Sequence, residues 1–314
     1  MTNTTMHLAR SSPRGAGEIS PSKRRKRTGQ GRAAALFLLP AGLGFAIFYF
    51  YPTVRGLILS FTNTTTLQSG SFIGIDNYTK AFSDPLFLNA LGVTFLYVVI
   101  NIVTQTLFAL ALAFMLHRVA KAAFWRSFVL LPWLVPGVTA ALLWMWLLDP
   151  SLGLVNGIFD SLGWAQLPFF AAPESAITTV AMVNTWRYTG YVAILLLAGM
   201  ESIPGGLYEA AALDGAGEWR MFRSITVPLL RPILTLVLII CMVGSVQIFD
   251  TIAVATEGGP LNSTNVLYYY IFQKAFTNFD LGYASAMAVV VLAILAVLTL
   301  LQFKLSRGNE SDLS

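Results

Sequence analysis

Four polar side chains share one face of an otherwise apolar segment in the middle of the chain. Asn184, Arg187, Tyr188 and Tyr191 are spaced i, i+3, i+4 and i+7, which places them on the same side of a helix. Amides and guanidinium groups hydrogen-bond to hydroxyls, and aromatic rings can stack on the C–H face of a sugar. The pattern favours a site for a hydroxyl-rich ligand. The alternative is that Arg187 pairs with Asp250 or a backbone carbonyl and only holds two helices together.

A second candidate feature is the sequence LLPWLVPG at residues 130–137. Trp133 and Gly137 are spaced i, i+4 and would share a helix face, beside Pro132 and Pro136, which should kink the helix. Trp133 could form an aromatic platform for a ligand, or it could face lipid or pack in the protein core.

A third feature is a group of small and polar residues in a later apolar segment, formed by Gly244, Ser245, Gln247 and Asp250. Polar side chains are costly inside a membrane and by default mark a transport path. Gly244 and Ser245 could equally allow two helices to pack closely.

A charged stretch, YEAAALDGAGEWRMFRSITVPL at residues 208–229, separates two long hydrophobic segments. Its first part favours a short helix that Asp214 and Gly215 end, because glycine is the usual left-handed cap. Glu218 to about Thr226 predicts a second short helix with an acidic residue at its start. The stretch should therefore form two short helices joined by a turn.

Large apolar side chains within this stretch suggest that it contacts a partner protein. Tyr208, Trp219 and Phe222 stand among polar neighbours, which is the composition of the centre of an interface. The alternative is an ordinary amphipathic loop that rests on the membrane.

The whole chain has the composition of an integral membrane protein. It has 314 residues, of which 56% are hydrophobic and 11% charged, whereas soluble domains carry about 25% charged residues. Six apolar segments are each long enough to form a helical span, which needs roughly 20 residues. They lie at about 33–52, 90–116, 126–148, 175–199, 231–254 and 283–303. The predicted fold class is an all-α membrane protein with six transmembrane helices.

Lysine and arginine residues predict the orientation in the membrane. If the N-terminus is cytoplasmic, sixteen of the twenty lie on the cytoplasmic side, which is the positive-inside pattern. The charged stretch and the C-terminus then also face the cytoplasm. We expect a basic, disordered tail over residues 1–32, a six-span domain over 33–303 and a cytoplasmic tail over 304–314. The basic tail would orient the first span and attract anionic membrane lipid rather than nucleic acid.

The segment SIPGGLYEAAALDGAGEWRMFRSITVPLLRP, Ser202 to Pro232, resembles the EAA-loop signature of ABC importer permeases. That signature has EAA, then Asp-Gly-Ala, then Ile, a variable residue and Leu-Pro, and the chain matches it with Val227 in place of Leu. Further similarity runs through LLPAGLGFAIFYFYPTVRGLILSFTN, NTWRYTGY and TEGGPLNSTNVLYYYIFQKAF, and so covers nearly all of the chain after the tail. The Thr-x-Gly-Gly-Pro element is similar to the carbohydrate-importer branch, and within it to the larger maltose-permease subunit.

The resemblance implies that the loop at about 202–230 is a coupling helix that inserts into a cytoplasmic ATPase subunit. The contact residues would be Glu209, Ala210, Ala211, Asp214 and Gly215. The implied partners are a dimer of ABC ATPases, a second permease of similar fold and a solute-binding protein that delivers the substrate. The segment Thr256–Asn265 would face that binding protein on the outer side of the inner membrane.

The resemblance also implies a sugar path through the spans. The positions that match the family's path are Trp133, Gly137, Asn184, Arg187, Tyr188, Tyr191, Gly244 and Ser245, and Gln247 and Asp250 join them as polar residues of the same segments. Side-chain identities match the family pattern chiefly at Asn184 and Tyr191. Arg187 departs from it and would favour an anionic or phosphorylated ligand such as glycerol 3-phosphate.

No cofactor is expected in this chain. None of its lysines follows a glycine, so it has no P-loop, and ATP and Mg²⁺ would bind the partner ATPase. A single cysteine excludes an internal disulfide, and two distant histidines, His7 and His117, do not suggest a metal site. The chain is therefore expected to be a transporter subunit and not an enzyme. An ion-coupled transporter is the other class, but only Asp250 is an acid within a span.

Overall fold

The computed structural model describes residues 28–118 and 123–307, so most of the predicted basic tail and the end of the C-terminal tail lie outside the described residues. The chain divides into two units, Met1–Thr53 and Val54–Ser314. Every regular element in the described ranges is helical apart from one isolated bridge between Thr62 and Phe72. The predicted all-α class is therefore confirmed.

The first unit holds the first apolar segment. Helix α1 covers Thr28–Phe45, a π-helical turn covers Ala46–Phe50, and α2 continues over Tyr51–Leu59 into the second unit. The stretch Leu36–Leu59 is long and apolar enough to cross a bilayer. Helix α1 begins within the residues that the sequence assigned to the tail.

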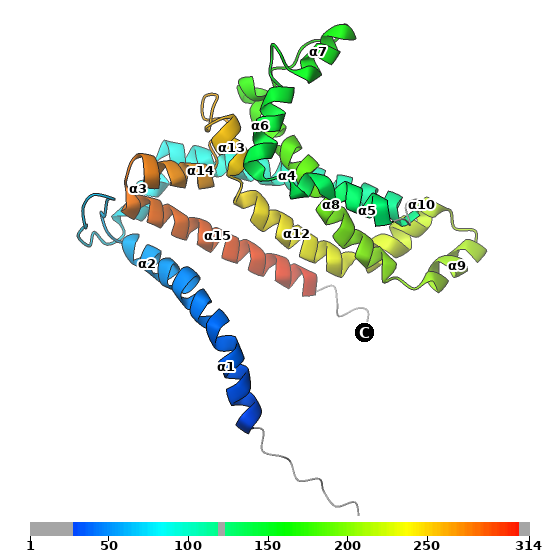
Figure 1. Ribbon diagram of the computed structural model, residues 1–314, viewed down its shortest axis with the longest axis horizontal. Coiled ribbons are helices and arrows are strands. Elements are labelled where there is room, and N and C mark those ends of the chain that lie inside the picture. The colour runs from blue at the N-terminus through cyan, green and yellow to red at the C-terminus, as the bar shows by residue number, and fades with distance from the viewer. Residues whose placement is uncertain (1–27, 119–122, 308–314) are drawn as a thin grey trace, which may run out of the picture. The chain divides into compact units, whose positions relative to one another are not determined.

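The second unit contains the remaining helices. They are α3 (Asp76–Ser83), α4 (Pro85–Arg118), α5 (Ala123–Leu134), α6 (Gly137–Leu147), α7 (Leu154–Ser161), α8 (Pro173–Glu201), α9 (Gly205–Leu213), α10 (Glu218–Met221), α11 (Val227–Leu229), α12 (Arg231–Val246), α13 (Asp250–Ala255), α14 (Leu267–Phe272) and α15 (Leu281–Arg307). Helices α4, α8, α12 and α15 run side by side, with α9 and α10 at one end and α3 and α14 at the other (Figure 1).

The number of spans depends on how two bent helix pairs are counted. Four helical stretches in the described residues are long and apolar enough to cross a membrane by themselves. The pairs α5–α6 and α8–α9 also pass this test together, with bends of 89° and 71° between their helices. The structure thus gives four to six spans, where the sequence predicted six.

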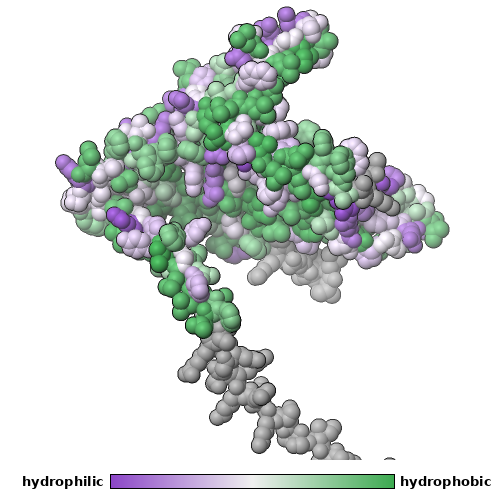
Figure 2. Space-filling model, viewed as in Figure 1, coloured by the Kyte–Doolittle hydropathy of each residue, from purple (hydrophilic) through white to green (hydrophobic). Residues whose placement is uncertain are grey.

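The helices of the second unit pack through three buried clusters, of which one lies beside the predicted site. Its members come from α4, α8 and α12 and include Ala109, Ala113, Leu196 and Val237. Small residues let these helices approach closely. Figure 2 shows hydrophobic side chains over much of the visible surface of these helices, which is expected where lipid takes the place of water.

Proline decides where the third apolar segment breaks. Pro136 has an extended ψ of 144° and precedes the first residue of α6, because proline cannot continue the hydrogen bonding of the preceding helix. The predicted kink is confirmed as a bend of 89°. The prediction that Trp133 and Gly137 share a helix face is wrong, because Trp133 belongs to α5 and Gly137 begins α6.

Candidate functional site

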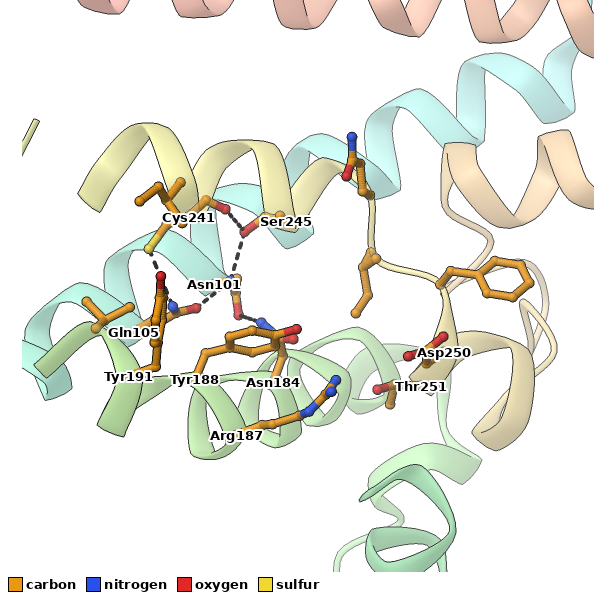
Figure 3. Close-up of a pocket in the computed structure, with 16 residues that line it drawn as sticks. Asn101, Gln105, Asn184, Arg187, Tyr188, Tyr191, Cys241, Ser245, Asp250 and Thr251 are labelled. Atoms are coloured by element: carbon orange, nitrogen blue, oxygen red, sulfur yellow. Dashed lines mark hydrogen bonds between the residues drawn. The ribbon is translucent and has the colours of Figure 1, made fainter. Parts of the chain in front are cut away.

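A cavity of about 190 Å³ lies between α4, α8, α12 and the start of α13 (Figure 3). It brings together eight of the ten residues that the sequence proposed for the path. These are Asn184, Arg187, Tyr188, Tyr191, Gly244, Ser245, Gln247 and Asp250. The four from α8 line the same cavity because their helical spacing puts them on one face.

Trp133 and Gly137 do not line the cavity, but each touches a residue that does. The Trp133 ring stacks on Tyr191, with centroids 4.9 Å apart and planes 12° apart. A Cβ on Gly137 would collide with the carboxylate of Asp250 and lie 2.9 Å from Nη1 of Arg187. A larger residue at position 137 would therefore displace the charged ends of Asp250 and Arg187.

Arg187 bonds to a backbone carbonyl, which is one of the two structural roles that the sequence left open for it. Its Nε donates a hydrogen bond to the carbonyl oxygen of Val135 at 3.0 Å, in the break between α5 and α6. Its guanidinium also lies over the ring of Tyr188, 5.1 Å from the centroid. Within the described chain no ion pair within 4.0 Å joins Arg187 to Asp250, although both reach the space beside Gly137. Arg187 and the Asp250 carboxylate thus both line the cavity without forming an ion pair.

Helix α4 supplies site residues that the sequence reasoning missed. Asn101 and Gln105, spaced i, i+4, line the cavity and are 1% and 4% exposed. Asn184 Nδ2 donates to Asn101 Oδ1 at 2.9 Å, and Asn101 Nδ2 donates to Ser245 Oγ at 2.8 Å. The signal was present, because two amides inside a span of mean hydropathy 2.2 are costly unless they serve a site.

Of Gly244 and Ser245, which the sequence offered as a close contact between helices, only Ser245 lies in such a contact. A Cβ on Gly244 would meet nothing within 4 Å, so Gly244 borders open space. Ser245 is 2% exposed and joins α12 to α4 through Asn101. Gln247 is exposed and lies where α12 ends.

The charged stretch folds as two short helices joined by a glycine turn. Helix α9 ends with the Gly215 N–H bonded to the Ala212 carbonyl and the Ala216 N–H bonded to the Ala211 carbonyl. This is a Schellman cap, and Gly215 takes the left-handed φ of 76° that the cap requires. The second helix begins at Glu218 and continues through a π-helical turn that ends at Thr226, as predicted.

Helix α9 presents its small residues outward. Glu209, Ala210, Asp214 and Gly215 are exposed in this chain, and Ala211 is half-buried. Their role in docking an ATPase stays a prediction.

The three apolar anchors of the stretch do not all face outward. Trp219 is 73% exposed and stacks on Phe222, whose ring packs edge-on against Phe114 of α4 at 5.0 Å. Tyr208 is half-buried and its hydroxyl hydrogen-bonds to Thr226 at 2.9 Å. Tyr208 and Phe222 therefore hold the two short helices to the chain, which leaves Trp219 as the exposed anchor.

The loop Thr256–Asn265 has a well-defined turn structure. Glu257, Gly258, Leu261 and Asn262 all have positive φ. The Thr264 hydroxyl crosses the loop and donates to the Gly259 carbonyl at 2.7 Å. Leu261 at its tip is 87% exposed.

No group of three or more His, Cys, Asp or Glu residues in the described part of the chain is placed to hold a metal ion.

Comparison with known proteins places the chain in one family. Residues 96–310 match the family described as "Binding-protein-dependent transport system inner membrane component". The chain therefore belongs to this family of ABC importer permeases, and it is a multi-pass inner membrane protein and not an enzyme.

Curated relatives cover most of the chain. The sulfoquinovosyl glycerol transport system permease protein of Agrobacterium fabrum is 35% identical over 88% of this chain and 91% of its own length. The lactose transport system permease protein of Rhizobium radiobacter is 32% identical over 88% and 94%. The sn-glycerol-3-phosphate transport system permease protein of Pectobacterium atrosepticum is 31% identical over 86% and 92%.

A solved structure shows the same fold. A chain of a bacterial ABC transporter involved in the import of the acidic polysaccharide alginate superposes with a TM-score of 0.80. It is 25% identical, over 90% of this chain and 97% of that chain. A second structure of the bacterial alginate ABC transporter, in complex with an alginate pentasaccharide-bound periplasmic protein, has a TM-score of 0.79.

Proposed function

We propose that this permease forms half of the translocation path of an ATP-driven importer for a neutral sugar. The observation that carries the proposal is the cavity between α4, α8 and α12, whose polar groups are mostly amides, hydroxyls and phenols, together with one guanidinium, that of Arg187, and one carboxylate, that of Asp250. These groups donate and accept hydrogen bonds in about equal measure, as a polyhydroxylated ligand requires. Tyr191, on which the Trp133 ring stacks, adds an aromatic side chain to this wall.

The charges of the cavity favour a neutral ligand over an anion. Arg187 is the cation that would attract a phosphate or carboxylate, but Asp250 lines the same cavity. One donor of Arg187 is also committed to the Val135 carbonyl. An anion would gain one attraction and meet one repulsion, whereas sugar hydroxyls can donate to Asp250 and accept from Arg187.

The curated relatives support a sugar as the transported ligand, and one of them keeps a phosphorylated ligand open as the alternative. The lactose and the trehalose/maltose transport permeases support a neutral sugar. The glycerol-3-phosphate permease supports a phosphorylated polyol on the same architecture. An ion-coupled mechanism has no support from these relatives.

Energy would come from a separate ATPase that docks on α9. The support is the exposed EAA segment with its glycine cap, and the absence of a P-loop from the sequence. ATP and Mg²⁺ would bind that ATPase, a second permease would complete the path, and both termini would be cytoplasmic. A solute-binding protein would meet the outer side near the loop Thr256–Asn265, which the alginate complex with its periplasmic protein supports by analogy.

Uptake by the complete importer in proteoliposomes tests this proposal. Radiolabelled lactose, trehalose and sn-glycerol 3-phosphate are offered separately with the cognate binding protein. We expect uptake of a neutral sugar, and a lower rate in Asn184→Ala and Tyr191→Ala with unchanged assembly. Uptake of glycerol 3-phosphate but of neither sugar would overturn the choice of ligand class, and normal kinetics in both variants would move the site elsewhere.

A further inference from the structure

Asn101 on α4 holds three side chains of the cavity wall at once (Figure 3). Its Nδ2 donates to Gln105 Oε1 at 3.1 Å and to Ser245 Oγ at 2.8 Å. Its Oδ1 accepts from Asn184 Nδ2 at 2.9 Å. Asn101 is 1% exposed, so all of its polar groups are used inside the protein. The residue thus joins α4 to α8 and to α12 at the level of the cavity.

Asn101, Gln105, Asn184 and Ser245 form a hydrogen-bonded group, the Asn101 cluster. Within it, the donor in one hydrogen bond determines which atom must be the donor in the next. Ser245 donates its hydroxyl hydrogen to the Cys241 carbonyl at 2.6 Å, so its Oγ must accept from Asn101. The Asn101 amide therefore turns its NH₂ group to Ser245 and its oxygen to Asn184. Asn184 then donates one of its two N–H groups to Asn101, which turns its NH₂ group towards α4 and leaves its carbonyl oxygen available to the cavity.

We propose that Asn101 is a positioning residue that sets the hydrogen-bonding polarity of the transport path. It holds Asn184 so that an acceptor faces the ligand, which selects a ligand hydroxyl that can donate. A deoxy or O-methyl sugar lacks that hydrogen and would leave the Asn184 oxygen unpaired, which a site built to bond a hydroxyl penalises strongly. This inference rests on the proposed function and adds a selection rule to it.

The chain offers a matched control. Thr104, three residues along α4, hydrogen-bonds to Thr185 of α8 at 2.9 Å. The pairs Asn101–Asn184 and Thr104–Thr185 both link α4 to α8. Unlike the first pair, Thr104 and Thr185 do not line the cavity. Thr104 also bonds to the backbone carbonyls of Ile100 and Asn101, but Thr104→Val removes none of the hydrogen bonds that the Asn101 side chain makes to Gln105, Asn184 and Ser245.

Cys241 gives a measurement that needs no ligand. It is the single cysteine of the chain, it lines the cavity, and its Sγ accepts from Gln105 Nε2 at 3.4 Å. In Asn101→Leu, Gln105 loses its partner and uncovers the thiol. In the complete importer, modification of Cys241 by methyl methanethiosulfonate should be about fivefold faster, the factor for one lost hydrogen bond. Mass spectrometry of this chain follows the rate.

A rate in Asn101→Leu equal to that in Thr104→Val would overturn the proposal. Asn101→Ala makes the same prediction and serves if the leucine variant does not assemble. In the uptake assay with labelled lactose and trehalose, the KM of the accepted sugar should rise about fivefold in Asn101→Leu, while Vmax stays unchanged. The Thr104→Val variant should keep the wild-type KM and Vmax. An unchanged KM in Asn101→Leu contradicts the proposal. If wild type accepts neither sugar, the proposed ligand class fails, while the labelling rates still decide the role of Asn101.

Discussion

The rings of Trp133 and Tyr191 lie nearly parallel, with centroids 4.9 Å apart. Trp133 is the last residue but one of α5, before the break at Pro136, and Tyr191 belongs to the polar face of α8. The stack thus couples the bend between α5 and α6 to a residue that lines the cavity. Any movement of α5 against α8 must slide or separate these rings.

Removing the Trp133 ring should weaken transport. An aromatic pair contributes about 1 kcal/mol beyond its buried area, so the KM for the imported sugar in Trp133→Ala should rise about fivefold. Trp125→Ala is the control, because Trp125 lies on the same helix and, among the aromatic residues of ranges 28–118 and 123–307, its ring contacts only Phe124 and Phe128 of α5. Equal effects of the two substitutions on uptake kinetics would show that the stack has no special role.

The glycine cap of α9 should be essential for coupling. Gly215→Val forces a β-branched residue to a φ of 76°, which costs about 1–3 kcal/mol and displaces the exposed EAA segment. We expect the ATPase subunits to hydrolyse ATP without uptake, as we also expect for Glu209→Lys. Gly217→Ala is the control, since Gly217 has an ordinary φ of −69° and open space around it. Coupled uptake at the wild-type rate in Gly215→Val would refute the docking role.

The sequence predicted local features better than those that depend on packing between helices. The cap at Gly215 and the proline break after Leu134 follow from backbone constraints of single residues, and both were predicted. The break at Gln247–Phe249 carries no proline, and the sharp bend that separates Trp133 from Gly137 could not be measured from the pattern. Asn101 was missed because its partners lie 83 and 144 residues away, and a helix pattern does not specify which helices become neighbours.

A methyl group on residue 137 should disturb the site directly. In Gly137→Ala the new Cβ would occupy the place of the Asp250 carboxylate and crowd Arg187. Because both groups line the cavity, we expect uptake to fall by about tenfold, a loss of ~1.4 kcal/mol, while the complex still assembles. Gly157→Ala in α7 has open space around it and should transport normally. Normal uptake in Gly137→Ala would mean that Asp250 can move without consequence for the path.

Asp84 should make stability depend on pH. Burial alone would raise the pKa of this carboxyl, but hydrogen bonds from the hydroxyls of Tyr270 and Tyr283 and from the backbone of Leu86 and Phe87 outweigh burial and lower it. A lowered folded-state pKa stabilises the protein above the unfolded value of about 3.9 and loses that effect as pH falls through the folded value.

We therefore expect Asp84→Asn to melt at a lower temperature than wild type at pH 6, and the difference to shrink as the pH falls below about 4. Tyr270→Phe removes one of the donors and should give a smaller change in the same direction. Thermal unfolding of the purified protein in detergent from pH 6 downwards measures this. A difference that stays constant with pH would contradict the assignment to the ionised carboxylate.

The most direct test of the whole account is the energy source of uptake. The complete importer is placed in proteoliposomes with ATP inside, ionophores collapse every ion gradient, and uptake of the sugar from its binding protein is followed. We predict that uptake continues as long as ATP is hydrolysed and stops with a non-hydrolysable analogue. Uptake that ceases when the ion gradients collapse, with ATP still present, would contradict the account.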